Sequence, residues 1–265
     1  MNFTDDQLER YARHIMLPEV GGTGQTRLLD ARVLVVGAGG LGSPLLLYLA
    51  AAGVGTLGIV DADTVDLTNL QRQVVHDGTG LGMLKVDSAA ARLNAINPEV
   101  RIEPHRTRLN AANAMELVSA YDVIADGTDN FATRFLLNDA CFFAGKTLVS
   151  AAILRFDGQV STFKPHAGPA HPCYRCLFPE PPPRGTVPTC AEGGIFGALA
   201  GAVGSLQAVE VLKEVLGIGE SLSGHLLLYD GLGATFRKIK VARDPDCQLC
   251  GERPTIITLE DGRDT

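Results

Sequence analysis

The sequence predicts an α/β fold with a Rossmann-like, mostly parallel sheet, helices on both of its faces, and a smaller β region near the carboxyl terminus. Three observations predict it. The apolar run Arg32–Val36 does not alternate with polar residues, which is typical of a parallel strand buried on both faces. The glycine-rich segment Gly37–Gly42 and a helical stretch, Ser43–Ala52, follow it at once. Further along the chain, apolar runs alternate with helical patterns at the spacing of an open parallel sheet.

The other elements follow in chain order. An amphipathic helix is expected at 5–16, a glycine-rich turn at Gly21–Gly24 and a long loop at 63–84. Further helices are predicted at 85–96, 111–119 and 130–144, and further strands at 56–60, 101–103, 122–126 and 147–151. After Gln159 the pattern changes to shorter β segments, a proline-rich loop, a buried apolar helix at 193–206 and strands at 225–229 and 234–241.

Length and charge exclude several classes of protein. At 265 residues the chain is expected to form one domain, with one part at 1–155, a second at 156–252 and a short polar tail at 253–265. The net charge of -7 argues against a nucleic-acid partner. The apolar stretch Gly193–Leu206, about fourteen residues, is shorter than the roughly twenty that span a membrane. The acidic first ten residues carry no apolar core, so we expect no signal peptide, no membrane partner and a cytosolic location.

The segment Gly37–Gly42, with sequence GAGGLG, predicts a nucleotide-phosphate site. Glycines let the backbone approach phosphate oxygens, and the following helix offers unpaired N–H groups and a partial positive charge. Asp61 ends the next apolar run, at the distance from Gly42 that suits an acidic residue binding a ribose hydroxyl. The alternative is that these glycines only allow tight packing of the helix.

Cations and carboxylates follow the glycine-rich segment closely. Arg72 and Lys85 are the candidates for binding a polyphosphate, and the alternative for each is a solvated surface residue. Asp129 follows another predicted strand and could hold Mg²⁺ as a hard oxygen ligand, whereas Asp126, nearer the strand, could cap the turn. Because carboxyl ends of parallel strands share one edge of a sheet, these loops should meet in one crevice.

Cysteine spacing is the second strong signal. Two CxxC pairs, Cys173 with Cys176 and Cys247 with Cys250, predict a tetrahedral thiolate site for structural zinc that clamps two distant segments. Closing so long a loop costs about 4–5 kcal/mol, and a structural zinc site supplies about 10–16 kcal/mol. Disulfides or unligated thiols are the alternatives. Cys141 lies among apolar residues at a helical position and is interpreted as a small core residue.

Cys190 follows the proline-rich loop and immediately precedes a predicted helix start. A loop position and a helix amino terminus both favour a reactive thiolate. An incidental loop thiol is the alternative.

Taken together, the motifs resemble one known family. GAGGLG at Gly37–Gly42, VDAD at Val60–Asp63, NLQRQ at Asn69–Gln73 and TDN at Thr128–Asn130 occur together with Lys85, the two CxxC pairs and RYAR at Arg10–Arg13. This combination resembles the ubiquitin-activating-like adenylyltransferases of the MoeB/ThiF/HesA group, from about Leu8 to Glu252. Such enzymes use ATP and Mg²⁺ to adenylate the terminal glycine of a small ubiquitin-fold sulfur-carrier protein that ends in Gly-Gly, with release of pyrophosphate.

The resemblance implies a role for each matched residue. Arg72 and Lys85 would hold the phosphates together with Asn69, Asp61 would bind the ribose, and Asp129 would position Mg²⁺. Arg13 would reach the ATP of a neighbouring subunit, which implies a homodimer. Cys190 would link covalently to the carrier, and the four paired cysteines would bind zinc. The whole nucleotide site would comprise Gly37, Gly39, Gly40, Gly42, Asp61, Asp63, Thr68, Asn69, Leu70, Gln71, Arg72, Lys85, Asp129 and Asn130.

Several alternatives stay open at this point. A nicotinamide-dependent (NAD) oxidoreductase would use the same glycine-rich loop, and a nucleotide-binding scaffold without chemistry is a third possibility. Some members of the family continue into a rhodanese domain, for which the sequence after Glu252 leaves no room, so an external sulfur donor is expected. The carrier itself, whether of molybdopterin, thiamine, tRNA thiolation or cysteine synthesis, is not determined by these motifs.

Overall fold

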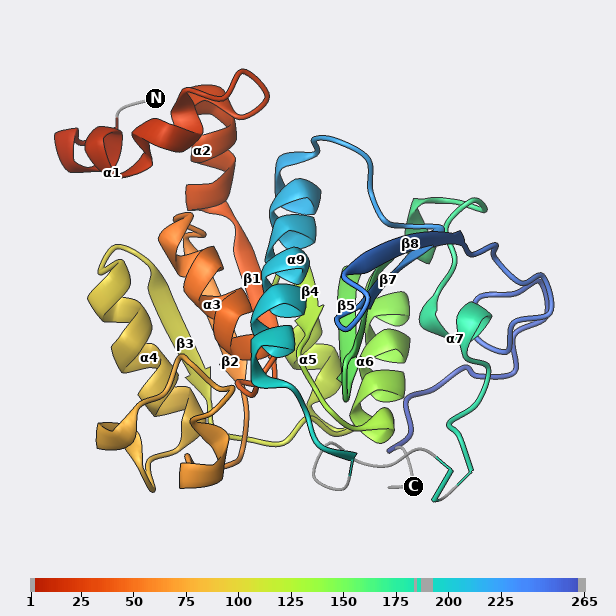
Figure 1. The fold of residues 1–265 in the computed structure, drawn as a ribbon. Coiled ribbons are helices and arrows are strands. Elements are labelled where there is room, and N and C mark those ends of the chain that lie inside the picture. The colour runs from red at the N-terminus through yellow and green to blue at the C-terminus, as the bar shows by residue number, and fades with distance from the viewer. Residues whose placement is uncertain (1–2, 184, 187–192, 262–265) are drawn as a thin grey trace.

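The computed structural model describes residues 3–183, 185–186 and 193–261, and its centre is one eight-stranded sheet (Figure 1). The strand order is β3-β2-β1-β4-β5-β6-β7-β8. Strands β1 to β5 are parallel to one another, and β6, β7 and β8 continue the sheet in antiparallel fashion. The strands are β1 (Arg32–Val36), β2 (Thr56–Val60), β3 (Arg101–His105), β4 (Val123–Asp126), β5 (Thr147–Leu154), β6 (Asp157–Phe163), β7 (His225–Asp230) and β8 (Thr235–Lys240).

Helices cover both faces of the sheet, as the sequence predicts. The α-helices are α1 (Asp5–Ile15), α2 (Gly21–Asp30), α3 (Gly42–Ala51), α4 (Lys85–Ile96), α5 (Ala114–Ser119), α6 (Phe131–Ala144), α7 (Tyr174–Leu177) and α9 (Gly197–Leu216). Three short 3-10 turns, η1 (Leu67–Asn69), η2 (Gly78–Gly80) and η3 (Pro165–Ala167), lie in loops. In β1, Val33 and Val35 pack in one core with α3, α4 and α9, whereas Leu34 and Val36 pack in a second core with α5 and α6. The unalternating apolar run of β1 is thereby explained.

The predicted limits of several elements are confirmed, and others change. Strands β1 and β2 and helix α4 have the predicted bounds. The strand predicted to end at Ala151 continues to Leu154, because residues 148–154 pair with β6. The smaller β region is confirmed as the three antiparallel strands, which extend the main sheet rather than forming a separate one.

The prediction of a turn at Gly21–Gly24 is wrong, since these residues form the first turn of α2. Long-range contacts stabilise this helix despite its glycines. The buried Gln25 side chain donates to the Ala52 carbonyl (3.0 Å), and Arg27 donates to the Leu216 carbonyl at the end of α9 (2.8 Å). Gly24 also lets α2 approach Leu216 closely. Tertiary packing here overrides low helix propensity.

The apolar helix predicted at 193–206 corresponds to α9, which begins at Gly197 and continues to Leu216. Its polar residue Gln207 is fully buried, and the Gln207 amide donates to the carbonyls of Asp126 (2.7 Å) and Val149 (3.0 Å). These bonds fix α9 to β4 and β5. None of the helices in the described ranges combines the length and apolar character of a membrane span.

The sheet order places the candidate site. Strand β1 lies between β2 and β4, so the chain runs outward from β1 in both directions and leaves a crevice at the carboxyl ends of these strands. This is the position at which open α/β sheets bind ligands.

Candidate nucleotide site and thiolate cluster

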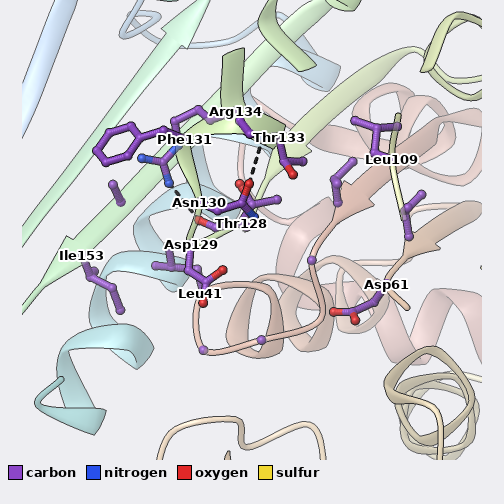
Figure 2. A pocket seen from close by; sticks show the side chains of 18 of the residues that line it. Leu41, Asp61, Leu109, Thr128, Asp129, Asn130, Phe131, Thr133, Arg134 and Ile153 are labelled. Carbon is purple, nitrogen blue, oxygen red and sulfur yellow. Dashed lines mark hydrogen bonds between the residues drawn. The ribbon is translucent and has the colours of Figure 1, made fainter. Parts of the chain in front are cut away.

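A cavity of about 750 Å³ occupies this crevice (Figure 2). The loops after β1, β2 and β4 line it, together with the start of α4 and residues 107–110 after β3. In the view of Figure 2, Asp61 and Asp129 lie on either side of the loop that leads into α3. The structure therefore brings together the three loops that the sequence predicts to share one ligand.

The glycines of the first loop have two different tasks. Gly37 has a φ of +95°, and a Cβ atom there would lie 2.8 Å from the Gly127 carbonyl oxygen; a Cβ atom on Gly42 would overlap the Gly37 carbonyl. Added Cβ atoms on Gly39 and Gly40 would meet protein atoms only at 3.7 Å and 3.4 Å. Gly37 and Gly42 are thus required by the fold, whereas Gly39 and Gly40 line the cavity and leave room for a ligand.

The same loop presents unpaired hydrogen-bond donors. Within the described part of the chain, the backbone N–H groups of Gly39, Gly40 and Leu41 donate to no protein group. They stand at the amino terminus of α3, where the helix dipole adds partial positive charge. This arrangement binds phosphate or carboxylate groups.

Asp61 is held rigidly beside this loop. One of its carboxylate oxygens accepts from the Ala38 N–H (2.8 Å), and the other accepts from the Asp63 N–H (2.8 Å). Asp61 is half-buried and lines the cavity. A carboxylate fixed in this way is placed to accept hydrogen bonds from ligand hydroxyl groups.

Two cations line the cavity at positions that the motifs predict. The Lys85 ammonium lies 3.0 Å from the Asp63 carboxylate, and its side chain is 9% exposed whereas that of Asp63 is 62% exposed. Lys85 is also the first residue of α4, where a cation opposes the helix dipole. The Arg72 guanidinium donates to the Thr68 carbonyl at 3.1 Å. Among the described residues, the exposed Asp63 carboxylate is the anion that pairs with the buried Lys85 cation.

Of the other predicted site residues, some line the cavity and some do not. Asn130 lines the cavity and caps α6, where its side chain accepts from the Thr133 N–H (2.9 Å). The Asn69 side chain accepts from the Asp66 N–H (3.1 Å) and so stabilises the turn that presents Arg72. Thr68, Leu70 and Gln71 belong to this turn, and like Asn69 and Gly42 they are not among the residues that line the cavity.

Two further predicted site residues, Arg13 and Cys190, are not placed at the cavity by the described part of the chain. Helix α1 carries Arg13 on its exposed side, and its Tyr11 packs over Gly53 and bonds to Asn97 (2.8 Å), near the amino ends of the strands. Helix α1, which carries Arg13, therefore lies near the end of the sheet opposite the cavity (Figure 1). Cys190 lies outside the described residues.

The sequence did not single out three buried polar residues at this site, of which Arg134 and Gln73 line the cavity. Arg134 is buried and donates to the Asp126 carboxylate (2.9 Å) and the Thr128 carbonyl (2.8 Å). Gln73 is buried next to Gly39, and its side-chain oxygen has no partner among the described residues. His76 lies under the glycine loop, where burial lowers the pKa of its imidazole. An arginine within the apolar pattern of α6 was the one signal in the sequence.

The four paired cysteines form one cluster. The Sγ–Sγ distances are 3.6 Å for Cys173 and Cys247, 3.4 Å for Cys176 and Cys250, and 3.9 Å for Cys173 and Cys176, and all four sulfurs lie within 4.8 Å of one another. Four thiolates at about 2.3 Å from a zinc ion would be about 3.8 Å apart. The donor set thus fits a closed zinc site with no open position for catalysis.

The cluster is tied to α6. Arg175 forms an ion pair with Asp139 (2.7 Å), and the Tyr174 N–H donates to the Asn138 side chain (2.8 Å). A hydrogen bond with Cys173 lowers the pKa of the Cys176 thiol. Cys141 lies in the core, where burial raises the pKa of its thiol well above the ordinary value, as expected for a packing residue.

The fold and the site define a Rossmann-like α/β protein with an anion-binding crevice and a clustered set of four cysteines. The ThiF family model matches residues 11–249, and the chain belongs to the ThiF family. It is 53% identical over 263 residues to the sulfur carrier protein adenylyltransferase of Thermus thermophilus, covering 98% of this chain and 97% of that protein. It is 52% identical to the SAMP-activating enzyme E1 of Haloferax volcanii, covering 93% of this chain and 90% of that protein.

Other relatives are longer or more distant. The adenylyltransferase and sulfurtransferase MOCS3 of Sus scrofa is 52% identical over 97% of this chain, which spans only 56% of that protein. Among solved structures, E. coli MccB with ATP has a TM-score of 0.75 at 18% identity, covering 94% of this chain and 82% of that one. E. coli MccB with MccA-N7isoASN has a TM-score of 0.79 at 21% identity, covering 95% and 76%. These likenesses confirm the fold.

Proposed function

We propose that the protein adenylates the carboxy-terminal glycine of a small ubiquitin-fold sulfur-carrier protein, using ATP and releasing pyrophosphate. One observation carries the proposal: the buried Lys85 and the half-buried Arg72 line the same cavity as Gly39 and Gly40, whose N–H groups have no acceptor among the described residues. Named relatives over 50% identical are adenylyltransferases of sulfur carriers, which supports this activity over the nicotinamide oxidoreductase alternative.

The chemistry follows from charge. A carrier carboxylate oxygen forms a bond to the α-phosphorus, and the bond from that phosphorus to the oxygen bridging to the β-phosphate breaks, so the pair of electrons leaves with pyrophosphate. The carboxylate is ionised at neutral pH, so no general base is required. Attacking and leaving groups are both anionic, and fixed cations lower the barrier by neutralising them.

Each residue then has a role in the proposal. Lys85 and Arg72 hold the phosphates, the loop N–H groups of Gly39 and Gly40 donate to them, and Asp61 accepts from the ribose hydroxyls. The exposed carboxylate of Asp129, a hard oxygen donor at the edge of the cavity, would hold Mg²⁺, which would supply further charge neutralisation. Bound zinc would fix the region of Cys173 and Cys247 without entering the reaction.

The remaining expectations belong to the same proposal. Arg13 lies too far from the cavity of its own chain, so it would act on the nucleotide of a second copy in a homodimer. The Cys190 thiolate would bond to the carboxyl carbon of the carrier adenylate as a thioester, the bond from that carbon to AMP would break and AMP would leave, and sulfur would come from an external donor. We also propose that residues 1–265 act as one domain in the cytosol, with 1–155 binding the nucleotide and 156–252 binding carrier and zinc.

The test is carrier-dependent exchange of pyrophosphate into ATP, measured against a panel of ubiquitin-fold carriers ending in Gly-Gly. Lys85→Ala and Arg72→Ala are expected to lower exchange by about 10²–10³-fold, the usual effect of removing a transition-state charge donor. Arg106→Ala is the matched control, because Arg106 pairs with Asp87 on the surface. Exchange at the wild-type rate in a folded Lys85 or Arg72 variant, or no exchange with any carrier, would contradict the proposal.

A further inference from the structure

His76 is a buried imidazole under the glycine loop that none of the proposed steps uses. It is 6% exposed, and both ring nitrogens have partners. Nε2 lies 2.9 Å from the Ala38 carbonyl oxygen, and Nδ1 lies 3.0 Å from the Ser88 hydroxyl on α4. A carbonyl oxygen only accepts, so the Nε2 proton donates to Ala38 and Nδ1 accepts from Ser88. Burial lowers the pKa of His76, which keeps this neutral tautomer at neutral pH.

The bond to Ala38 fixes the direction of the next N–H group. The peptide between Ala38 and Gly39 is trans and planar, so its C=O and its N–H point in opposite directions. His76 holds the C=O on the side of α4, and the Gly39 N–H must therefore point away from His76. Gly39 lines the cavity, and its N–H has no protein acceptor among the described residues.

This peptide has no other firm constraint. Gly39 lacks a Cβ atom, so its backbone tolerates both orientations of the peptide plane. The Ala38 N–H, which bonds to Asp61, belongs to the preceding peptide and does not fix this one. Among the described residues, only His76 donates a hydrogen bond to the Ala38 carbonyl oxygen.

We propose that His76 is a positioning residue that turns the Gly39 N–H toward the nucleotide phosphates. The inference rests on the proposed function only in assigning a phosphate-bearing nucleotide to the cavity. Without His76 the peptide would sample the flipped orientation, in which a carbonyl oxygen faces the phosphates and repels them.

The test compares two variants and two ligands by calorimetry. In His76→Asn the amide reaches only the position of Nδ1, so the donor to Ala38 is lost; in His76→Gln the amide reaches the position of Nε2 and restores it. We expect His76→Asn to weaken binding of magnesium ATP about tenfold, the value of one hydrogen bond to a charged group. Adenosine, which lacks phosphate, should bind with unchanged affinity, and His76→Gln should recover most of the ATP affinity.

Several outcomes of these measurements would overturn the proposal that His76 positions the Gly39 N–H. Equal losses for ATP and adenosine would indicate a merely structural role, and no loss, or no recovery in His76→Gln, would overturn the proposal. If His76→Asn does not fold, Ser88→Ala, which removes the partner of Nδ1, replaces it and should weaken ATP alone; an unchanged ATP affinity there refutes the inference. A wild-type protein that binds adenosine but not ATP would refute both this inference and the proposed function. ATP binding without pyrophosphate exchange would contradict the proposed function alone.

Discussion

Replacing Arg134 by methionine tests whether the ion pair behind the cavity is needed for stability. Asp126 is fully buried, and its carboxylate accepts from the Thr128 N–H (3.0 Å), the Thr128 hydroxyl (2.6 Å), the Ser150 hydroxyl (2.7 Å) and Arg134 Nε (2.9 Å). Arg134 also donates to the carbonyls of Thr128 and Ala151. The substitution leaves a buried carboxylate without its cation and two carbonyls without that donor.

The expected loss is large because the charge stays buried. Removing one partner of a buried ion pair costs about 3–5 kcal/mol, whereas an exposed pair contributes about 0–1 kcal/mol. The matched control is Arg106→Met, since Arg106 forms two bonds with Asp87 (2.7 Å and 3.1 Å) and its side chain is 56% exposed. With an urea m-value of about 3 kcal/mol/M, Arg134→Met should lower the unfolding midpoint by about 1–2 M.

The assay is urea unfolding followed by circular dichroism at neutral pH, with both variants beside the wild-type protein. A third variant separates charge from packing: in Asp126→Asn/Arg134→Met the buried group is neutral, so about 1–3 kcal/mol should return. An Arg134→Met midpoint close to that of Arg106→Met would refute this account of the network. A double variant no more stable than Arg134→Met would show that packing rather than charge causes the loss.

Three further predictions concern the metal, a tyrosine and the glycine loop. Purified protein should contain about one zinc per chain by elemental analysis. Replacing Cys247 by serine, or removing the metal with a chelator, should lower the melting temperature by about 10 °C. An unchanged melting temperature after zinc loss would contradict a structural role. Burial and the hydrogen bond to Glu103 raise the pKa of Tyr121 well above its ordinary value. The free energy of unfolding should therefore fall as the pH rises above 10, by about 1 kcal/mol more at pH 11 than in Tyr121→Phe; parallel pH profiles would argue against it. Gly42→Ala should lower the free energy of unfolding by about 2–3 kcal/mol because its Cβ would overlap the Gly37 carbonyl. Gly40→Ala should leave the free energy of unfolding unchanged and weaken ATP binding. Unfolding curves measure the first effect and calorimetry measures the second.

Most of the parallel sheet could be predicted from the sequence because the signals are local. Strand β1, the glycines and α3 follow one another directly, and buried parallel strands consist of unbroken apolar runs. Helix α2 could not be predicted this way, because Gln25 and Arg27 find their partners at Ala52 and at Leu216, far along the chain. The full length of α9 was missed for the same reason. The sequence suggests that Gln207 is a surface residue that ends the apolar helix, whereas its amide is buried and bonds two carbonyls far along the chain.

The residues of the candidate site also differ in whether a local motif marks them. Residues within short motifs, such as Asp61, Arg72 and Lys85, were placed at one cavity correctly because each follows a strand or starts a helix next to it. Buried residues that bond these loops were missed, since a lone His76 has no local pattern that marks it and Arg134 is marked only as an arginine within the apolar pattern of α6. Their partners lie 38 positions away for His76 and Ala38, and 8 positions away for Arg134 and Asp126.

These indirect contacts explain how a loop of small residues keeps a fixed shape. A Cβ atom on Gly37 would lie only 2.8 Å from the Gly127 carbonyl oxygen, so the loop after β1 packs closely against the loop after β4. The loop after β4 is held from behind by Arg134, which bonds the Thr128 carbonyl, and Gln207 bonds the Asp126 carbonyl beside it. Such buried polar bonds add less stability than apolar packing would, but they specify direction, which apolar contacts do not. Because Asp129 directly follows Thr128, the network that fixes the Thr128 carbonyl also sets where the Asp129 carboxylate stands relative to the glycine loop.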